Sequence, residues 1–330
     1  MENKTIDFEI KDKNYSLPNT WEGLSTDQFI HLSGVLRRYA SGELSMSDVR
    51  LEYVCYFLEV DLNKKISSKQ SEVIAANLYI LLRLVTFIFD IKYEKGALDN
   101  IPKEIRSMAL KTEPVDMDDS PEVRFLRKKE YQFVVSAIFA KQLIPEITVK
   151  GITYKGYEIN CMMDMLSCSL TASQYIDASD VLSSLADNPS RLSLLAAILY
   201  CPGIYNSAWS HDHASDFTYV DYQTLEAISL NFQALSLYLF KRTHFDILWR
   251  GGKDKTSEIS LGMSDILLNL SQDGLGDINT IEQINVIKYL SIMRKKLIES
   301  VHSMHAAKMD FIDIAKATGL ETTIVQKIIN

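Results

Sequence analysis

Glycine and proline are scarce in this sequence, with 13 and 7 residues among 330. Both residue types favour turns and interrupt helices, so their scarcity excludes a collagen-like or loop-rich chain and favours helices. The four cysteines form no CxxC pair, and no apolar leader follows the first methionine. We therefore expect reduced thiols in a cytosolic protein rather than a disulfide framework.

The sequence also lacks a net positive charge and the common catalytic motifs. The net charge is −8, which disfavours nonspecific binding to nucleic acid. The sequence has no GxGxxG, GxxxxGK(S/T), HExxH or GxSxG motif, and "GGKDKT" at 251–256 has the letters of a phosphate loop without its spacing. We expect no enzyme, and hence no catalytic, cofactor-binding or metal-binding residues.

One long apolar run raises the question of a membrane span. Residues 73–91, "VIAANLYILLRLVTFIFDI", reach the length of a bilayer-crossing helix. Asn77 and Arg83 interrupt the run, and an arginine at the centre of a span costs about 2.5–3.5 kcal/mol. The run therefore predicts a buried core helix rather than a membrane span.

A repeated phrase is the most informative feature that is present. "LSTDQFI" at 24–30 returns as "LTASQYI" at 170–176. Ser25 with Gln28, and Thr171 with Gln174, fit the capping box, in which a hydroxyl and a Gln side chain satisfy backbone groups of the first helical turn. Apolar residues follow each cap at helical spacing, so each phrase predicts the start of a helix.

The flanks of the two phrases also agree. The alternating segments 6–17 and 147–159 precede them and predict β-hairpins. Short apolar helices are expected from Arg50 and Arg191, and long ones from Asn77 and Asn231. We expect a mainly α-helical protein of helical bundles with two small hairpins and an internally duplicated module. The alternative is two unrelated helical segments that begin with the same kind of N-terminal cap.

The expected domains are 1–145, 146–250 and 251–330. Residues 111–122 predict an exposed acidic loop, and 122–143 a helix that leads into the second hairpin. In the last domain, Thr280 with Gln283 fits a third capping box before a long amphipathic helix. The final residues, 309–330, predict two helices around a turn at Gly319, the outline of a helix-turn-helix.

Two clusters suggest alternative functions. The terminal helix pair could belong to a DNA-associated regulator, but its second helix holds Lys327 and no arginine. "HDHASD" supplies His211, His213 and Asp216, which could bind a divalent cation in a metal-dependent enzyme. The plainer interpretations are a helix hairpin that packs or binds partners and a solvated loop.

The segment 15–32, "YSLPNTWEGLSTDQFIHL", resembles the opening of tail-assembly chaperones of tailed phages that infect Bacteroidota, in which a β-hairpin precedes "LP..W..LT..Q...L" and a helical bundle. Residues 266–293 resemble the C-terminal part of such phage structural proteins. Typical chaperones are shorter and do not contain the module twice. The role is therefore open between a chaperone, a virion neck or tail component and a packaged internal protein.

The resemblance implies a non-enzymatic structural or assembly protein that acts through protein–protein contacts and has no cofactor. Its partners would be other phage structural or tail proteins, or further copies of the same chain in a homo-oligomer, with no membrane. We expect it in the host cytoplasm, with the virion as a second location. Packing or interface anchors are expected at the aromatic residues that follow the two caps or precede them, and at the tryptophan before "HDHASD": Trp21, Phe29, Tyr175 and Trp209.

Overall fold

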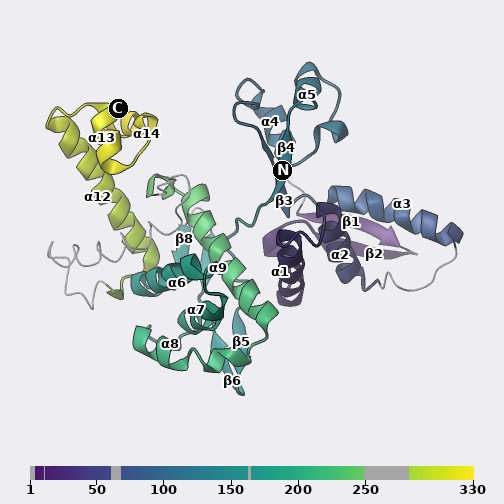
Figure 1. Ribbon diagram of the computed structural model, residues 1–330, viewed down its shortest axis with the longest axis horizontal. Helices are drawn as coiled ribbons and strands as arrows, with labels where there is room; N and C mark the ends of the chain where they lie inside the picture. The colour runs from purple at the N-terminus through teal and green to yellow at the C-terminus, as the bar shows by residue number, and fades with distance from the viewer. Residues whose placement is uncertain (1–3, 11, 61–67, 163–164, 249–281) are drawn as a thin grey trace. The chain divides into compact units, whose positions relative to one another are not determined.

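Helices dominate the computed structural model, which describes residues 4–10, 12–60, 68–162, 165–248 and 282–330 (Figure 1). The strands of this described part form four two-stranded antiparallel sheets. The expected fold class, mainly α-helical with small hairpins, is confirmed, with two strand pairs more than the sequence predicted. The chain divides into two compact units, Met1–Ala137 and Ile138–Asn330.

The first unit opens with the expected hairpin and capped helix. Its N-terminal elements are β1 (Thr5–Ile10), β2 (Lys13–Pro18), η1 (Trp21–Gly23), α1 (Thr26–Ala40), α2 (Met46–Leu58) and α3 (Ser68–Leu84). The helix α1 packs on α2, and α2 packs on α3. Tyr53 of α2 donates a 2.6 Å hydrogen bond to the carbonyl oxygen of Pro18. This bond ties the end of the hairpin to the helices that follow.

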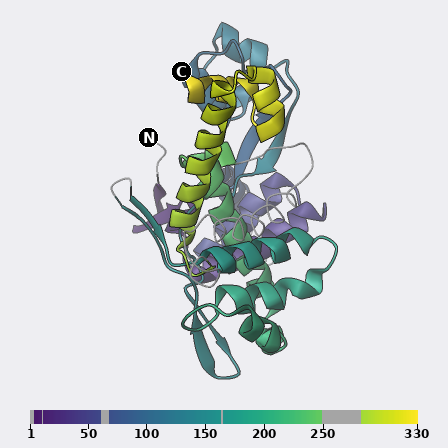
Figure 2. The same ribbon diagram turned by 90° about the vertical axis from the view of Figure 1, so that its left-hand side faces the viewer.

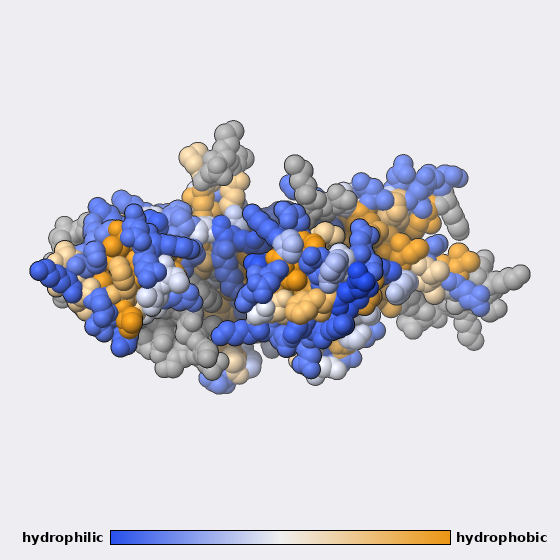
Figure 3. Space-filling view, turned by 90° about the horizontal axis from the view of Figure 1, so that it is seen from above, coloured by the Kyte–Doolittle hydropathy of each residue, from blue (hydrophilic) through white to orange (hydrophobic). Residues whose placement is uncertain are grey.

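The apolar run 73–91 does not form the buried helix that was expected. The helix α3 ends at Leu84, and it leaves Val73, Tyr79 and Ile80 about 60% exposed. Figure 3 shows hydrophobic atoms at the surface on the side where α3 lies. The buried part of the run comes after the helix, in the segment 85–91. Among the described helices, none is both long and apolar enough to cross a membrane.

A strand pair in the first unit brackets a small helical segment, which we call the insertion. Strand β3 (Phe89–Tyr93) pairs with β4 (Tyr131–Val135), and between them lie α4 (Lys103–Ala109), η2 (Pro114–Asp116) and α5 (Pro121–Leu126). The expectation of one helix over 122–143 is therefore wrong. The segment 131–135 is rich in aromatic and β-branched residues, and it gains a strand partner in β3. Tyr131 and Phe133 pack on the core of the insertion.

The second unit begins with two hairpins and continues with helices. The elements are β5 (Glu146–Val149), β6 (Ile152–Lys155), β7 (Ile159–Met162), β8 (Met165–Cys168), α6 (Ala172–Ser184), η3 (Pro189–Arg191), α7 (Leu192–Leu199), α8 (Ser207–His213), η4 (Asp216–Tyr219), α9 (Tyr222–Arg242) and η5 (Asp246–Leu248). Every residue of α7 is buried, and α7 packs against α6, α8 and α9. It is therefore the central helix of this unit.

The C-terminal helices form a small cluster of their own. They are α12 (Val286–Ala306), α13 (Phe311–Thr318) and α14 (Thr322–Ile329), and Figures 1 and 2 show α13 and α14 folded back on the far end of α12. Val301, Ile314 and Val325 are fully buried between them. Gly319 has a φ of 71°, which suits glycine and ends α13 at the expected turn. The expected helix pair is confirmed, and α12 adds a third helix.

The two caps of the repeated phrase differ in one contact. Ser25 and Gln28 form the complete capping box that was expected. Thr171 accepts a hydrogen bond from the backbone N–H of Gln174, but the Gln174 side chain donates instead to the carbonyl oxygen of Ile198 at 2.8 Å. The second capping box is therefore only half formed, because the buried end of α7 offers Gln174 an acceptor. The expected third box, at Thr280, lies outside the described residues.

The order of elements agrees with an internal duplication. A hairpin, a capped helix, a second helix and a long helix occur in both units, and the helices pack in the same sequence, α1–α2–α3 and α6–α7–α9. The hairpin β7–β8 and the helix α8 have no counterpart between β1 and α3. A shared order of elements does not establish a shared shape, so the duplication stays a prediction.

Candidate functional site

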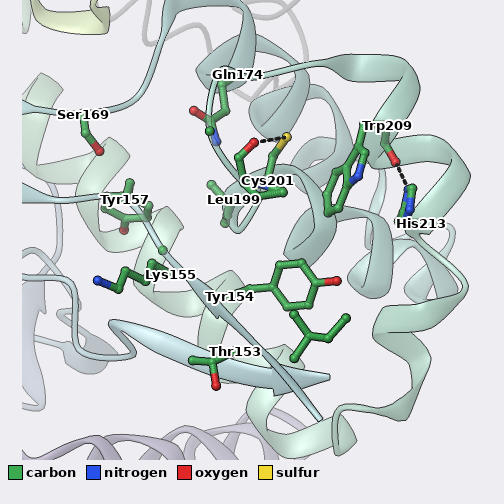
Figure 4. Close-up of a pocket in the computed structure, with 14 residues that line it drawn as sticks. Thr153, Tyr154, Lys155, Tyr157, Ser169, Gln174, Leu199, Cys201, Trp209 and His213 are labelled. Atoms are coloured by element: carbon green, nitrogen blue, oxygen red, sulfur yellow. Dashed lines mark hydrogen bonds between the residues drawn. The ribbon is translucent and has the colours of Figure 1, made fainter. Parts of the chain in front are cut away.

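A hollow of about 660 Å³ runs beside strand β6 in the second unit (Figure 4). Its lining contains every residue of β6 and residues from α6, α7, α8 and the loop between α7 and α8: Ile152, Thr153, Tyr154, Lys155, Gly156, Tyr157, Ser169, Gln174, Leu199, Cys201, Pro202, Gly203, Trp209 and His213. No residue of β5 lines it. Since β5 occupies the other side of β6, the hollow follows the outer edge of the sheet. We call this hollow the β6 groove.

A tight turn fixes which backbone groups of β6 face outward. Lys150 and Gly151 connect the strands with φ values of 50° and 80°, the pattern of a type I′ hairpin turn. Val149 then pairs with Ile152 next to the turn, and Thr148 opposes Thr153 as a non-hydrogen-bonded pair. The Oγ1 atoms of Thr148 and Thr153 lie 3.3 Å apart, as expected for such a pair. The N–H and C=O groups of Thr153 and Lys155 therefore point away from β5.

The strand is held close to the end of α7 at Gly156. Its N–H donates to the carbonyl oxygen of Pro145 at 2.8 Å. A Cβ at this position would lie 2.9 Å from Nε2 of Gln142 and 3.1 Å from Cε1 of Tyr200, so a larger residue would have to displace the Gln142 side chain and the Tyr200 ring. The Tyr200 hydroxyl donates to the carbonyl oxygen of Ile144 at 2.6 Å. These contacts fix the floor of the groove.

An aromatic wall faces the strand. The ring of His213 stacks on that of Trp209 at 4.4 Å, and the Nδ1 atom of His213 lies 2.9 Å from the Trp209 carbonyl oxygen. The ring of Tyr154 lies 6.1 Å from Trp209 and 5.3 Å from Phe217. Figure 4 shows Tyr154 pointing toward Trp209 and Lys155 pointing away from it. Tyr154, Trp209 and His213 are each half-buried, so part of every side chain in this wall is exposed.

The lining of the β6 groove contains two basic residues, Lys155 and His213, and no aspartate or glutamate. Lys155 is exposed. The hairpin turn beside the groove carries Lys150, whose Nζ lies 2.5 Å from Oδ1 of Asp216. The hydrogen bond from Lys150 lowers the pKa of Asp216. This pair neutralises Lys150 and joins the turn to η4, whereas Lys155 has no ion pair in the described part of the chain.

The strand end is followed by a buried tyrosine, Tyr157. Tyr157 is 5% exposed and lines the β6 groove as well as a second hollow, of about 700 Å³. Its hydroxyl is buried and has no hydrogen-bond partner among the described residues. Burial raises the pKa of Tyr157 well above its ordinary value, so the hydroxyl stays neutral. A buried hydroxyl without a partner carries a free-energy cost.

The sequence-predicted anchors separate into two groups. Trp21, Phe29 and Tyr175 are buried, at 4%, 0% and 2% exposure, and serve the cores of their units. Trp21 donates from Nε1 to the carbonyl oxygen of Ser136 at 2.7 Å and meets the ring of Phe29 edge-on. Trp209 alone of the four lies in the β6 groove. Trp21 and Phe29 therefore share one contact in the first unit, whereas in the second unit Tyr175 packs on Phe232 and Trp209 stacks on His213.

Sequence reasoning missed most of the groove. The residues Tyr154, Lys155, Gly156 and Tyr157 were assigned only to a hairpin. A signal was present in "TYKGY", where a glycine sits between two aromatic residues at the end of an alternating run. Such a glycine indicates a close backbone approach.

The "HDHASD" cluster is not the loop that was expected. It spans the end of α8 and the start of η4, where His213 stacks on Trp209 and Asp216 pairs with Lys150. In the described part of the chain, no group of three His, Cys, Asp or Glu residues gathers as metal ligands would. The segment "GGKDKT" lies outside the described residues.

The arrangement of the β6 groove suits binding. Within the described residues it offers backbone groups at Thr153 and Lys155 without a backbone partner, half-buried aromatic side chains and a lysine without an ion pair, next to a tight turn and a closely packed glycine. Comparison with known proteins adds no guidance: no protein-family model, no curated protein and no solved structure matches this chain.

Proposed function

We propose that this protein is a non-enzymatic phage structural or assembly protein that acts through protein–protein contacts. The observation that carries the proposal is the outer edge of β6, whose backbone groups at Thr153 and Lys155 face a groove with an aromatic wall. An unpaired strand edge is a template for pairing with another chain.

Two further features support protein binding. Strand addition takes its affinity from backbone hydrogen bonds and its specificity from side-chain pockets, and the β6 groove supplies both kinds of contact. The helix α3 of the first unit exposes Val73, Tyr79 and Ile80 on one element, more apolar surface than a helix in contact only with water usually carries. The resemblance of residues 15–32 to phage tail-assembly chaperones supplies the biological setting.

Co-expression tests this proposal. The full chain would be produced together with each tail, neck and capsid protein encoded by neighbouring genes, and the mass of the purified species measured by size-exclusion chromatography with light scattering. We expect a complex of fixed stoichiometry with at least one of these proteins. If the chain elutes alone beside every one of them, the proposed function is wrong.

A DNA-associated regulator is the second candidate, and the C-terminal cluster favours it. A helix-turn-helix needs a supporting third helix, and α12 packs on α13 and α14 in that position. The cluster also has an excess of basic residues within an acidic chain. Its basic residues are Lys288, Arg294, Lys295, Lys296, Lys308, Lys316 and Lys327, and its acidic residues are Glu299, Asp310, Asp313 and Glu321.

Electrophoretic mobility shifts with double-stranded DNA distinguish this candidate. A regulator would bind with an affinity that falls steeply with salt, and deletion of 308–330 would abolish binding. Because the deletion uncovers Val301, the charge variant Lys316→Glu with Lys327→Glu serves as a second test that leaves the core intact. Binding that survives both changes, or no binding by the full chain, contradicts a DNA function of this cluster.

A further inference from the structure

We propose that the β6 groove holds an extended acidic segment of a partner protein, which adds to the β5–β6 sheet as a third strand. In this segment apolar and acidic residues alternate. The inference rests on the proposed function and goes further, because it names the site, the binding mode and the chemistry of the partner segment.

Backbone geometry provides the first argument. Thr153 and Lys155 stand two positions apart on β6, so their outward N–H and C=O groups form the repeat with which an added strand pairs. Among the described residues, no backbone hydrogen bond reaches these groups on the outer side. The type I′ turn and the contacts of Gly156 hold the edge in place before a partner arrives, which lowers the entropic cost of binding.

Alternation of side chains sets the pattern of the segment. Tyr154 and Lys155 point to opposite faces of β6, and an added strand places its successive side chains on the same two faces. On the Tyr154 face, an apolar side chain would contact Tyr154 and the Trp209–His213 stack. On the Lys155 face, the neighbouring side chain would meet the ammonium group of Lys155.

Charge selects an acidic partner. The chain as a whole has a net charge of −8, yet the lining of the β6 groove has Lys155 and His213 and no carboxylate. Glu146 opposes Lys155 in the sheet, and Glu146, Lys155 and Glu158 all line the second hollow. Neither glutamate forms an ion pair with Lys155 in the described part of the chain. An acidic side chain that enters from the β6 groove would give Lys155 an ion-pair partner.

Selection from a displayed library tests the inference directly. Random peptides of about ten residues, long enough to pair along β6, would be selected against the full chain. The enriched peptide would be synthesised and its dissociation constant measured by fluorescence anisotropy. We expect alternating apolar and acidic residues in the enriched set. N-methylation of the two alternate residues that pair with β6 should weaken binding at least about tenfold, whereas N-methylation of the intervening residues should not.

Matched protein variants locate the peptide. Lys155→Glu and Trp209→Ala should each weaken binding about tenfold or more. Arg242→Glu removes an exposed arginine at the end of α9 in the same unit and should leave the dissociation constant unchanged. The circular dichroism spectrum and the thermal midpoint show whether each variant is folded. If no peptide is enriched, or if Lys155→Glu binds the peptide as the unchanged chain does, the inference is overturned.

Two other outcomes have distinct meanings. The chain's own strand β1, "TIDFEI", alternates apolar and acidic residues. Light scattering could show self-association that depends on concentration and is abolished by Lys155→Glu. This result would assign the β6 groove to a second copy of the chain and overturn the inference of a different partner protein. If Lys155→Glu and Trp209→Ala leave a complex with a structural protein intact, the proposed function stands and the groove assignment fails.

Discussion

At the scale of the residue, His31 shows how burial changes the behaviour of a titratable group. His31 of α1 stacks on Tyr56 of α2 at 3.9 Å, and its Nε2 atom is buried without a hydrogen-bond partner among the described residues. Burial lowers the pKa of His31, against the opposing effect of Glu52. The folded protein therefore disfavours the charged imidazole more than the unfolded chain does.

The pH dependence of stability follows from this shift. Because the pKa is lowered in the folded state, the stabilising contribution is complete above the ordinary histidine pKa of about 6.5 and is lost as the pH falls through the lower folded value. We expect the free energy of unfolding of the first unit to decrease between about pH 7.5 and 5.5. His31→Phe keeps the stacking and removes the titration, so it should flatten this decrease. An unchanged slope in urea denaturation of His31→Phe would show that other groups cause it.

Trp21 offers a second test at the scale of the residue. It is 4% exposed, it contacts Phe29 and Phe87 edge-on, and it donates to the carbonyl oxygen of Ser136. Trp21→Phe keeps a ring but leaves this buried carbonyl without its donor, so the free energy of unfolding should fall by about 1–3 kcal/mol. Trp209→Phe is the control, because Trp209 is half-buried and its change should cost less. Equal costs in urea denaturation would contradict the assigned role of Trp21.

At the scale of the element, the two copies of one phrase have different partners. The Ser25 and Thr171 caps could be predicted from sequence because a cap depends on residues within one helical turn. The partner of Gln174 could not, because Ile198 approaches only when α7 packs on α6. For the same reason the sequence predicted β1–β2 and β5–β6 but missed β3–β4, whose strands are separated by a helical segment. The local hairpin β7–β8 was missed as well.

The two glutamines should therefore differ in their contribution to stability. Gln28→Ala removes a half-exposed capping contact and should cost about 0.5 kcal/mol. Gln174→Ala removes a buried hydrogen bond and leaves the carbonyl oxygen of Ile198 with only the longer, 3.4 Å bond from the N–H of Cys201, so it should cost about 1–3 kcal/mol. Urea denaturation of the two variants measures the difference. A larger loss for Gln28→Ala would reverse the assignment of the two caps.

At the scale of the whole molecule, composition and pattern predicted the helical class correctly. The scarcity of glycine and proline and the period of apolar residues are averages over the chain. The helical class that they predict therefore does not depend on the correct prediction of every element. The β6 groove depends instead on a few positions that meet in three dimensions, such as Gly156 against Tyr200. Of its residues only Trp209 was predicted as an interface anchor, whereas His213 was considered for a metal site and Gln174 for a helix cap.

The division into two compact units predicts two unfolding events. Each unit has its own buried core, so we expect two transitions in differential scanning calorimetry of the full chain. Trp21→Phe should lower the temperature of one transition, and Gln174→Ala that of the other. A single transition moved by both variants would show that the units unfold together.

Hydrogen exchange at two amides tests the central claim most directly. Among the described residues, the N–H groups of Thr153 and Lys155 have no backbone hydrogen-bond partner, and we propose that a partner strand supplies one. In the free protein these amides should exchange quickly, and the N–H of Ile152, which faces β5, should exchange more slowly. In a complex with a phage structural protein, exchange at Thr153 and Lys155 should slow at least about tenfold. If a complex forms and both amides still exchange at the rate of the free protein, the β6 edge is not the binding site.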